Sequence, residues 1–215
     1  MNTPEVTIID YGVGNLLSVK RGFEHCGAKV VLTSDANLIL ASQRVVLPGV
    51  GAFPKAMDEL QKLNLVSVIK ELALLGTPLL AICLGMQLLM DESEEFGLTP
   101  GLGLIPGRVV AVPEMTIEGT TQKIPHIGWS SLHSSNKNIN WTGTLLQDNE
   151  VGDPVYFVHS YMAQPASPIN QVAHAMYGGH RISAVISKNR ITGCQFHPEK
   201  SGDMGLKILR KFCLD

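Results

Sequence analysis

Charged residues are scarce in this sequence. Asp, Glu, Lys and Arg make up 17% of its 215 residues, and the formal net charge is −2. Lysine and arginine form no basic stripe, which argues against nucleic acid as a partner. The low charge fits either a surface covered by another protein or a large core, since 45% of the residues are hydrophobic.

Long apolar runs are missing as well, and so is an obvious targeting segment. The run over residues 72–80 contains Gly76 and Pro78, so no membrane span is predicted. Residues 1–10 carry no basic stretch ahead of an apolar run that stops at Asp10, so no signal peptide is predicted.

Cysteine is rare and scattered: the four residues Cys26, Cys83, Cys194 and Cys213 form no Cys-x-x-Cys pair. This favours the reducing cytoplasm over a disulfide framework, and the spacing supports no metal site. Cofactor motifs are absent too. Gly12 and Gly14 lack the third glycine of a dinucleotide site, because Leu17 occupies that position, and no P-loop occurs. We therefore expect no cofactor.

The first half of the chain alternates between strands and helices. Apolar runs predict strands at residues 6–9, 29–32, 45–47 and 79–82, and helical patterns fall at residues 16–25, 55–75 and from Leu84 onwards. This alternation predicts an α/β fold with a mostly parallel central sheet and helices on both faces.

The second half differs in composition. Residues 100–143 are rich in Pro, Gly and Ser without helical periodicity, and β-rich segments at 173–177, 182–186 and 191–196 predict a meander of hairpins. A last helix is predicted over about residues 205–212. Because no repeat or domain boundary is visible, we expect a single domain over residues 1–215.

Cys83 stands at a predicted turn from a buried strand into a helix, within residues 81–85 (Ala-Ile-Cys-Leu-Gly). A nucleophile on such a turn needs small residues two positions before and after it, and Ala81 and Gly85 are small. The turn would expose the thiol at the carboxyl edge of the sheet, and the helix start would favour thiolate. Gln87, one helical turn on, could present its amide to a substrate. The alternatives are a buried core cysteine and a solvent-facing glutamine.

His197 begins the sequence His-Pro-Glu after the last predicted strand. Pro198 disfavours helix for the residue before it, so we expect an extended segment in which His197 and Glu199 share a face. The carboxylate would then orient the imidazole as a general base. The alternative is a surface histidine beside an ion-paired glutamate. The competing histidines, which lack a carboxylate at this spacing in a comparable segment, are His126, His133, His159, His174 and His180. We interpret His159, which lies in an apolar run, as a packed structural residue.

A glycine-rich turn follows the third predicted strand, where Gly49 and Gly51 flank Val50. Glycine tolerates positive φ and can thereby turn a main-chain N–H towards a developing oxyanion. The N–H of Leu84, directly after the cysteine, is the natural second donor. The alternative is an ordinary strand-to-helix turn.

Over nearly its whole length, the sequence resembles the class I, triad-type glutamine amidotransferases. Cys-x-Gly-x-Gln with a late His-Pro-Glu is typical of that family. Pro-Gly-Val-Gly and His-Ile-Gly-Trp resemble, more specifically, its glutaminase subunits of imidazole glycerol phosphate synthase. The motifs that carry the resemblance lie at residues 9–15, 48–53, 82–87, 126–129, 156–161 and 196–201.

The resemblance implies hydrolysis of glutamine to glutamate and ammonia, with Cys83 as nucleophile, His197 as general base and then acid, and Glu199 as its orienter. It implies no cofactor. The glutamine site it implies, partly of backbone groups, lies near Gly51, Gln87, Ser160 and Tyr161.

The resemblance also implies a heterodimer with a (β/α)8-barrel cyclase. That subunit would receive the ammonia through its interior and make imidazole glycerol phosphate and AICAR in histidine biosynthesis. Asn15, Trp129 and Lys200 would lie at or near the interface. The chain alone would have weak activity, because the loop over residues 48–51 would need the partner to present its oxyanion donor.

Two departures from the family pattern leave alternatives open. Ala81 replaces a common glycine, with little expected effect. Residues 178–187 and the segment after Lys200 look like paralogues from surface-polysaccharide gene sets, which are thought to supply ammonia for amidino sugars. Other rivals are a thiol peptidase or γ-glutamyl hydrolase, against which Gln87 and Trp129 count, and a regulatory subunit with a decayed site, against which the intact triad counts.

Overall fold

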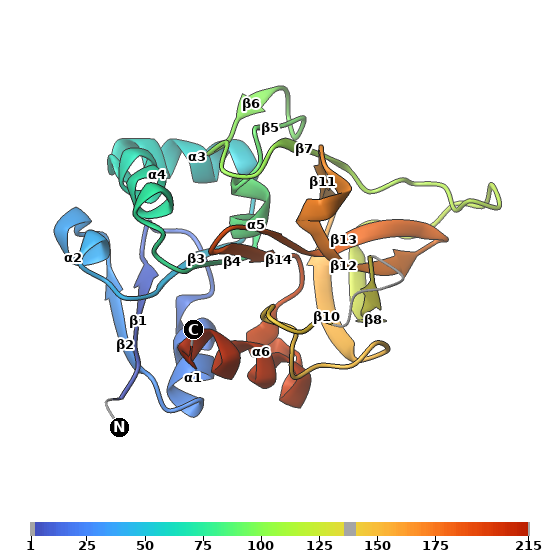
Figure 1. Ribbon diagram of the computed structural model, residues 1–215. Coiled ribbons are helices and arrows are strands. Elements are labelled where there is room, and N and C mark those ends of the chain that lie inside the picture. Colours follow the sequence, from blue (N-terminus) through green and yellow to red (C-terminus); the bar gives the residue numbers. More distant parts are fainter. Residues whose placement is uncertain (1–2, 136–140, 215) are drawn as a thin grey trace.

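The computed structural model describes residues 3–135 and 141–214 (Figure 1). Within these residues the largest sheet has eight strands in the order β2-β1-β3-β4-β14-β13-β12-β9. Their bounds are β1 Glu5–Ile9, β2 Lys29–Thr33, β3 Val45–Gly49, β4 Leu79–Cys83, β9 His133–Ser134, β12 Gln171–Tyr177, β13 His180–Lys188 and β14 Ile191–Cys194. Strands β2, β1, β3, β4 and β14 run parallel, and β13, β12 and β9 continue the sheet antiparallel.

Helices cover both faces of the parallel part, as the alternation of elements predicts. Helices α2 (Ala36–Leu40), α3 (Phe53–Lys62) and α4 (Leu65–Leu75) lie on one face, and α1 (Leu16–His25) and α6 (Gly202–Leu214) lie on the other (Figure 1). Successive strand residues point to opposite faces. Leu47 therefore packs in the core under α3 and α4, whereas Val46 packs in the core over α1 and α6. The predicted fold class is confirmed.

The second half adds the predicted meander β12-β13-β14 and two smaller sheets. One sheet pairs β8 (His126–Ser131) with β10 (Pro154–His159), and the other has the order β11-β7-β5-β6. The strands of the latter are β5 Glu92–Ser93, β6 Thr99–Pro100, β7 Gly107–Ala111 and β11 Tyr161–Pro165. Strands β10 and β11 are separated only by Ser160, so the chain passes directly from one small sheet to the other.

Three local predictions need correction. The helix expected over residues 55–75 is two helices, because Asn64 adopts a left-handed conformation (φ 56°) that ends α3 and redirects the chain. Helix α2 was not predicted; the Asp35 carboxylate begins it by accepting hydrogen bonds from two main-chain N–H groups. Helix α6 begins at Gly202, ahead of its predicted start. Within the described ranges, no helix has the length and apolarity needed to span a membrane.

Candidate active site

Cys83 is the last residue of β4, and helix α5 (Leu84–Leu88) begins directly after it. Its backbone is held at φ 56° and ψ −112°, a conformation that non-glycine residues rarely adopt. The turn is tight because α5 lies against β3. A Cβ on Gly85 would stand 2.1 Å from the main-chain oxygen of Leu47. The small residue expected two positions after the cysteine is therefore needed to avoid backbone of the neighbouring strand.

The loop after β3 uses its two glycines differently from each other. Gly51 has the expected positive φ of +92°, but Gly49 does not have positive φ, so that part of the prediction is wrong. Gly49 is required for space, since a Cβ there would lie 2.8 Å from the Gly85 nitrogen and 2.9 Å from the Tyr11 hydroxyl oxygen. That hydroxyl donates a 2.7 Å hydrogen bond to the Pro48 carbonyl. Burial raises the pKa of Tyr11, so the hydroxyl keeps its proton.

His197 and Glu199 form a buried pair. Nδ1 of the imidazole lies 2.8 Å from a Glu199 carboxylate oxygen, and the side chains are 3% and 0% exposed. His197 itself is extended, as expected before Pro198, but the extended segment does not continue: residues 198–200 form a 3-10 turn (η2, Pro198–Lys200). This turn brings the carboxylate back to the ring that precedes it.

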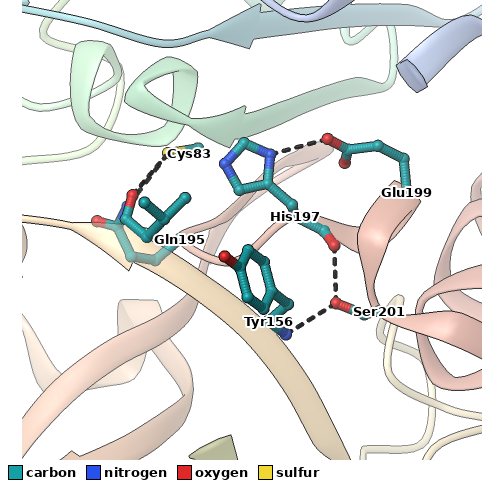
Figure 2. A network of polar contacts seen from close by, with 7 residues as sticks. Cys83, Tyr156, Gln195, His197, Glu199 and Ser201 are labelled. Carbon is teal, nitrogen blue, oxygen red and sulfur yellow. Dashed lines mark hydrogen bonds and ion pairs between the residues drawn. The ribbon is translucent and has the colours of Figure 1, made fainter. Parts of the chain in front are cut away.

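The His197 ring lies between Cys83 and Glu199 (Figure 2). Burial alone would lower the pKa of His197, but the Cys83 and Glu199 side chains more than compensate and raise it to about 9. The second ring nitrogen, Nε2, is buried and has no hydrogen-bond partner among the described residues. The imidazole is thus anchored on one side and open towards the thiol on the other, the arrangement that activates a nucleophile.

A cleft of about 400 Å³ opens at these residues. Most of the residues expected at the site line this cleft. The expected residues that do not line it are Gly49, Glu199, Asn15 and Trp129. The expected residues in its wall are Val50, Gly51, Cys83, Leu84, Gln87, Ser160, Tyr161, His197 and Lys200. Residues that sequence reasoning did not place there are Glu95, Pro125, Val158 and His159.

Glu95 reaches the cleft from a segment that carries no motif, and His159 from the motif over residues 156–161, where only Ser160 and Tyr161 were expected at the site. The Glu95 carboxylate accepts a 2.7 Å hydrogen bond from the main-chain N–H of Phe53, at the start of α3. His159, 6% exposed, is a packed residue as interpreted, but it is also part of the cleft wall.

Two glutamine amides continue the cleft wall into the interior. Nε2 of Gln87 donates to the Tyr161 carbonyl (2.8 Å) and to Oε1 of Gln195 (3.0 Å), so both of its hydrogens are used inside the protein. Nε2 of Gln195 lies 3.9 Å from the Cys83 sulfur (Figure 2). Sequence reasoning missed Gln195. The available signal was a polar side chain, next but one before His197, in an otherwise apolar strand end.

A chain of neutral histidines packs behind the same wall. His159 Nδ1 lies 2.8 Å from the Tyr161 carbonyl, and His159 Nε2 lies 3.1 Å from His126 Nδ1. His126 Nε2 lies 2.9 Å from the Ser130 hydroxyl. Burial lowers the pKa of His126 to about 4 and that of His159 to about 3, so neither is protonated at neutral pH.

The three residues expected at a partner interface are all exposed to solvent. Asn15 precedes α1 and makes no side-chain capping bond. Trp129 is 57% exposed on β8 and contacts the Tyr156 ring edge-on. Lys200 lies at the cleft itself. Their exposure leaves them available for a partner.

The four cysteines are all free. Burial raises the pKa of Cys26, Cys194 and Cys213, that of Cys213 to about 11. These three thiols therefore stay protonated near neutral pH. Among residues 3–135 and 141–214, no group of three or more His, Cys, Asp or Glu side chains is arranged to hold a metal ion.

Comparison with known proteins places this geometry in a family. The sequence model described as "Glutamine amidotransferase class-I" matches residues 7–215. The chain belongs to the class-I glutamine amidotransferases. Members of this family hydrolyse glutamine, and the cleft with its buried Cys83, His197 and Glu199 lies inside the matched region.

Similar amidotransferases include proteins named as subunits of one enzyme. The chain is 50% identical over 207 residues to "Imidazole glycerol phosphate synthase subunit HisH 1" of Legionella pneumophila (strain Lens), covering 96% of this chain and 97% of that protein. It is 44% identical over 209 residues to the subunit HisH of Lactococcus lactis, covering 97% of each.

Solved structures of lower identity share the fold. PurLQS from Thermotoga maritima superposes with a TM-score of 0.69 at 18% identity, covering 99% of this chain and 98% of that one. A glutamine amidotransferase from the same organism gives a TM-score of 0.62 at 16% identity, covering 93% and 77%. At this identity the likeness concerns the fold alone.

Proposed function

We propose that this amidotransferase is the glutaminase subunit of an imidazole glycerol phosphate synthase and supplies ammonia to a cyclase subunit in histidine biosynthesis. The observation that carries the proposal is the 50% identity, over 96% of the chain, to a protein of that name. The amidino-sugar alternative predicts the same glutaminase chemistry with a different acceptor, so the two differ in which partner stimulates turnover.

The buried triad supports a two-step reaction. His197 takes the proton of the Cys83 thiol, and the thiolate attacks the side-chain amide carbon of glutamine. The tetrahedral intermediate collapses as His197 gives its proton to the amide nitrogen, which leaves as ammonia and leaves a γ-glutamyl thioester. His197 then removes a proton from water, which attacks the thioester and releases glutamate with the thiol restored. Glu199 orients the ring and stabilises its charged form, in line with the pKa of about 9.

The proposed substrate contacts lie in the wall around Cys83. Val50, Gly51 and Leu84 supply the backbone of the oxyanion site, and Ser160 and Tyr161 flank the glutamine. Because both hydrogens of the Gln87 amide nitrogen are already used, Gln87 would meet a substrate through its carbonyl oxygen. Gly49 supports this site from beneath, by allowing β3 to approach α5.

The proposed partner is a (β/α)8-barrel cyclase that forms a heterodimer with this chain. Asn15, Trp129 and Lys200 are exposed and available for that contact. A complex would also provide a reason for weak activity of the chain alone, by fixing the exposed Val50 of the oxyanion loop. We further propose that the complex acts in the cytoplasm, which the four free cysteines support.

The test is release of glutamate from glutamine by the purified chain, alone and with a histidine-pathway cyclase plus its ribonucleotide substrate. We expect strong stimulation by the partner with its substrate, and loss of turnover in Cys83→Ser. Normal turnover in Cys83→Ser would refute the triad assignment.

The remaining outcomes separate the rivals. Absence of stimulation, in a preparation whose Cys83 still reacts with a glutamine analogue, would favour the sugar-amidating role. Cleavage of peptides or γ-glutamyl peptides without turnover of free glutamine would favour a thiol peptidase or γ-glutamyl hydrolase.

A further inference from the structure

Gln195 is a fully buried polar residue whose side chain reaches the nucleophile. It follows β14 directly, is 0% exposed, and is anchored by a 2.9 Å hydrogen bond from its main-chain N–H to the Ala184 carbonyl. Its amide approaches the Cys83 sulfur from a different side than the His197 ring (Figure 2). The two-step reaction of Cys83 and His197 does not involve this side chain.

The Tyr161 carbonyl determines the orientation of the Gln195 amide, because Gln87 is hydrogen-bonded to both. The Tyr161 carbonyl can only accept, so the amide nitrogen of Gln87, 2.8 Å away, must face it. The Gln87 nitrogen can only donate, so the atom of Gln195 that lies 3.0 Å from it must be the amide oxygen. The Gln195 nitrogen is then left on the side of Cys83. Flipping either amide would oppose two donors or two acceptors.

We propose that Gln195 is a positioning residue that donates a hydrogen bond to the Cys83 sulfur, and that Gln87 and the Tyr161 carbonyl fix its donor in that direction. The inference rests on the proposed function in taking Cys83 as the nucleophile. A thiol at rest can donate to the Val158 carbonyl, 3.9 Å from the sulfur, whereas a thiolate can only accept. Gln195 therefore stabilises the sulfur in the form that attacks.

Burial makes such a donor valuable. Cys83 is 6% exposed, so water gives its thiolate little solvation, and an unpaired buried charge is costly. An amide donor offsets part of that cost without carrying charge, and so does not compete with His197 for the proton.

A second set of hydrogen bonds also ends at the Tyr161 carbonyl. Because this carbonyl accepts from His159 Nδ1–H, His159 Nε2 must accept from His126 Nδ1–H, and His126 Nε2 from the Ser130 hydroxyl. The Tyr161 carbonyl therefore fixes which atom donates in each of these hydrogen bonds. Strand β8, which carries exposed Trp129, is thus joined to the nucleophile by continuous, fully oriented hydrogen bonds.

The experiment measures the rate at which iodoacetamide alkylates Cys83 as a function of pH, with the modified residue located by mass spectrometry. In Gln195→Met, which keeps the length and removes the donor, we expect the midpoint of the profile to move to higher pH and the rate near neutral pH to fall about tenfold. In Gln195→Glu the midpoint also moves to higher pH, because the carboxyl loses its donor when it ionises and then repels the thiolate. Gln171→Met is the matched control: its amide donates to the Ser183 hydroxyl at 2.7 Å, and its profile stays that of the wild type.

Equal profiles for Gln195→Met, Gln195→Glu and the wild type would overturn the proposal. If circular dichroism shows that neither Gln195 variant folds, Gln87→Met decides. It leaves Gln195 in place and removes the two hydrogen bonds, to the Gln195 oxygen and to the Tyr161 carbonyl, that orient the Gln195 amide. It must move the profile in the same direction by a smaller amount, and an unchanged profile rejects the role. Alkylation needs no glutamine turnover, so the profiles test Gln195 independently. A wild type that hydrolyses no glutamine even with the cyclase and its substrate present would refute the proposed function.

Discussion

The two walls of the cleft are held together by different forces. On the side of β3, β4 and α5, backbone touches backbone: there is no room for a Cβ on Gly49 or Gly85. On the side of β10, β11 and η2, side chains are held by directed hydrogen bonds, such as those of His159 and His197. One wall therefore depends on the size of its residues and the other on their donors and acceptors. Substitutions that change size should unfold the first wall, and those that change only polarity should disable the second without unfolding it.

The largest effect is expected for Gly85→Ala. The added methyl would meet the Leu47 carbonyl at 2.1 Å, where only backbone can move, so we expect a loss of more than about 3 kcal/mol in the free energy of unfolding. Denaturant unfolding of the purified variant checks this. Gly22→Ala is the control, because its Cβ would meet the flexible end of the Leu209 side chain at 2.8 Å and alanine favours helix α1. Equal stability of the two variants would contradict the steric account.

Glu199→Gln changes polarity at nearly constant size. We expect kcat for glutamine to fall about a hundredfold or more while the variant stays folded, because the amide no longer stabilises the protonated imidazole of His197. Steady-state kinetics with the stimulating partner present measures this. Glu94→Gln is the control, since that exposed carboxylate accepts from the Ala111 N–H outside the cleft. A loss of stability in Glu199→Gln without a fall in kcat would contradict the comparison.

A third prediction concerns the dependence of stability on pH. The pKa of His197 is raised in the folded protein to about 9 from an ordinary value of 6.5, so the folded state favours its proton. This contribution is fully present below about pH 6.5 and is lost as pH rises through about 9. The difference in the free energy of unfolding between wild type and His197→Asn should therefore shrink over that window. A difference that grows with pH would contradict this prediction, because it would mean that folding lowers the pKa of His197.

The smallest effect is expected for Tyr11→Phe, which removes one hydrogen bond from the packed wall. The Pro48 carbonyl loses its 2.7 Å donor, and we expect a loss of about 1 kcal/mol in the free energy of unfolding with the backbone contact of Gly49 retained. Thermal unfolding and glutamate release measure the two quantities. A larger loss of kcat than that of Glu199→Gln would show that the packed wall also depends on its polar contact.

The sequence predicted the packed wall better than the hydrogen-bonded one. Strand periodicity and the small residue after Cys83 are local properties, and they located β4 and its turn. The Gln87–Gln195 pair joins residues 108 positions apart, and no local pattern encodes such a contact. The break at Asn64 was missed because apolar spacing continues through it while the backbone does not. His197 and Glu199 were correctly paired for a wrong reason, since a turn and not an extended strand brings them together.

The ring N–H protons of His126 and His159 can serve as NMR probes. Each keeps a single nitrogen-bound proton, held in a hydrogen bond of fixed direction inside the cleft wall. Such protons exchange slowly with water, so each should give a separate downfield signal in a proton NMR spectrum of the unlabelled protein. These two signals would act as native probes within the cleft wall, and would register any rearrangement there when glutamine or a partner protein binds.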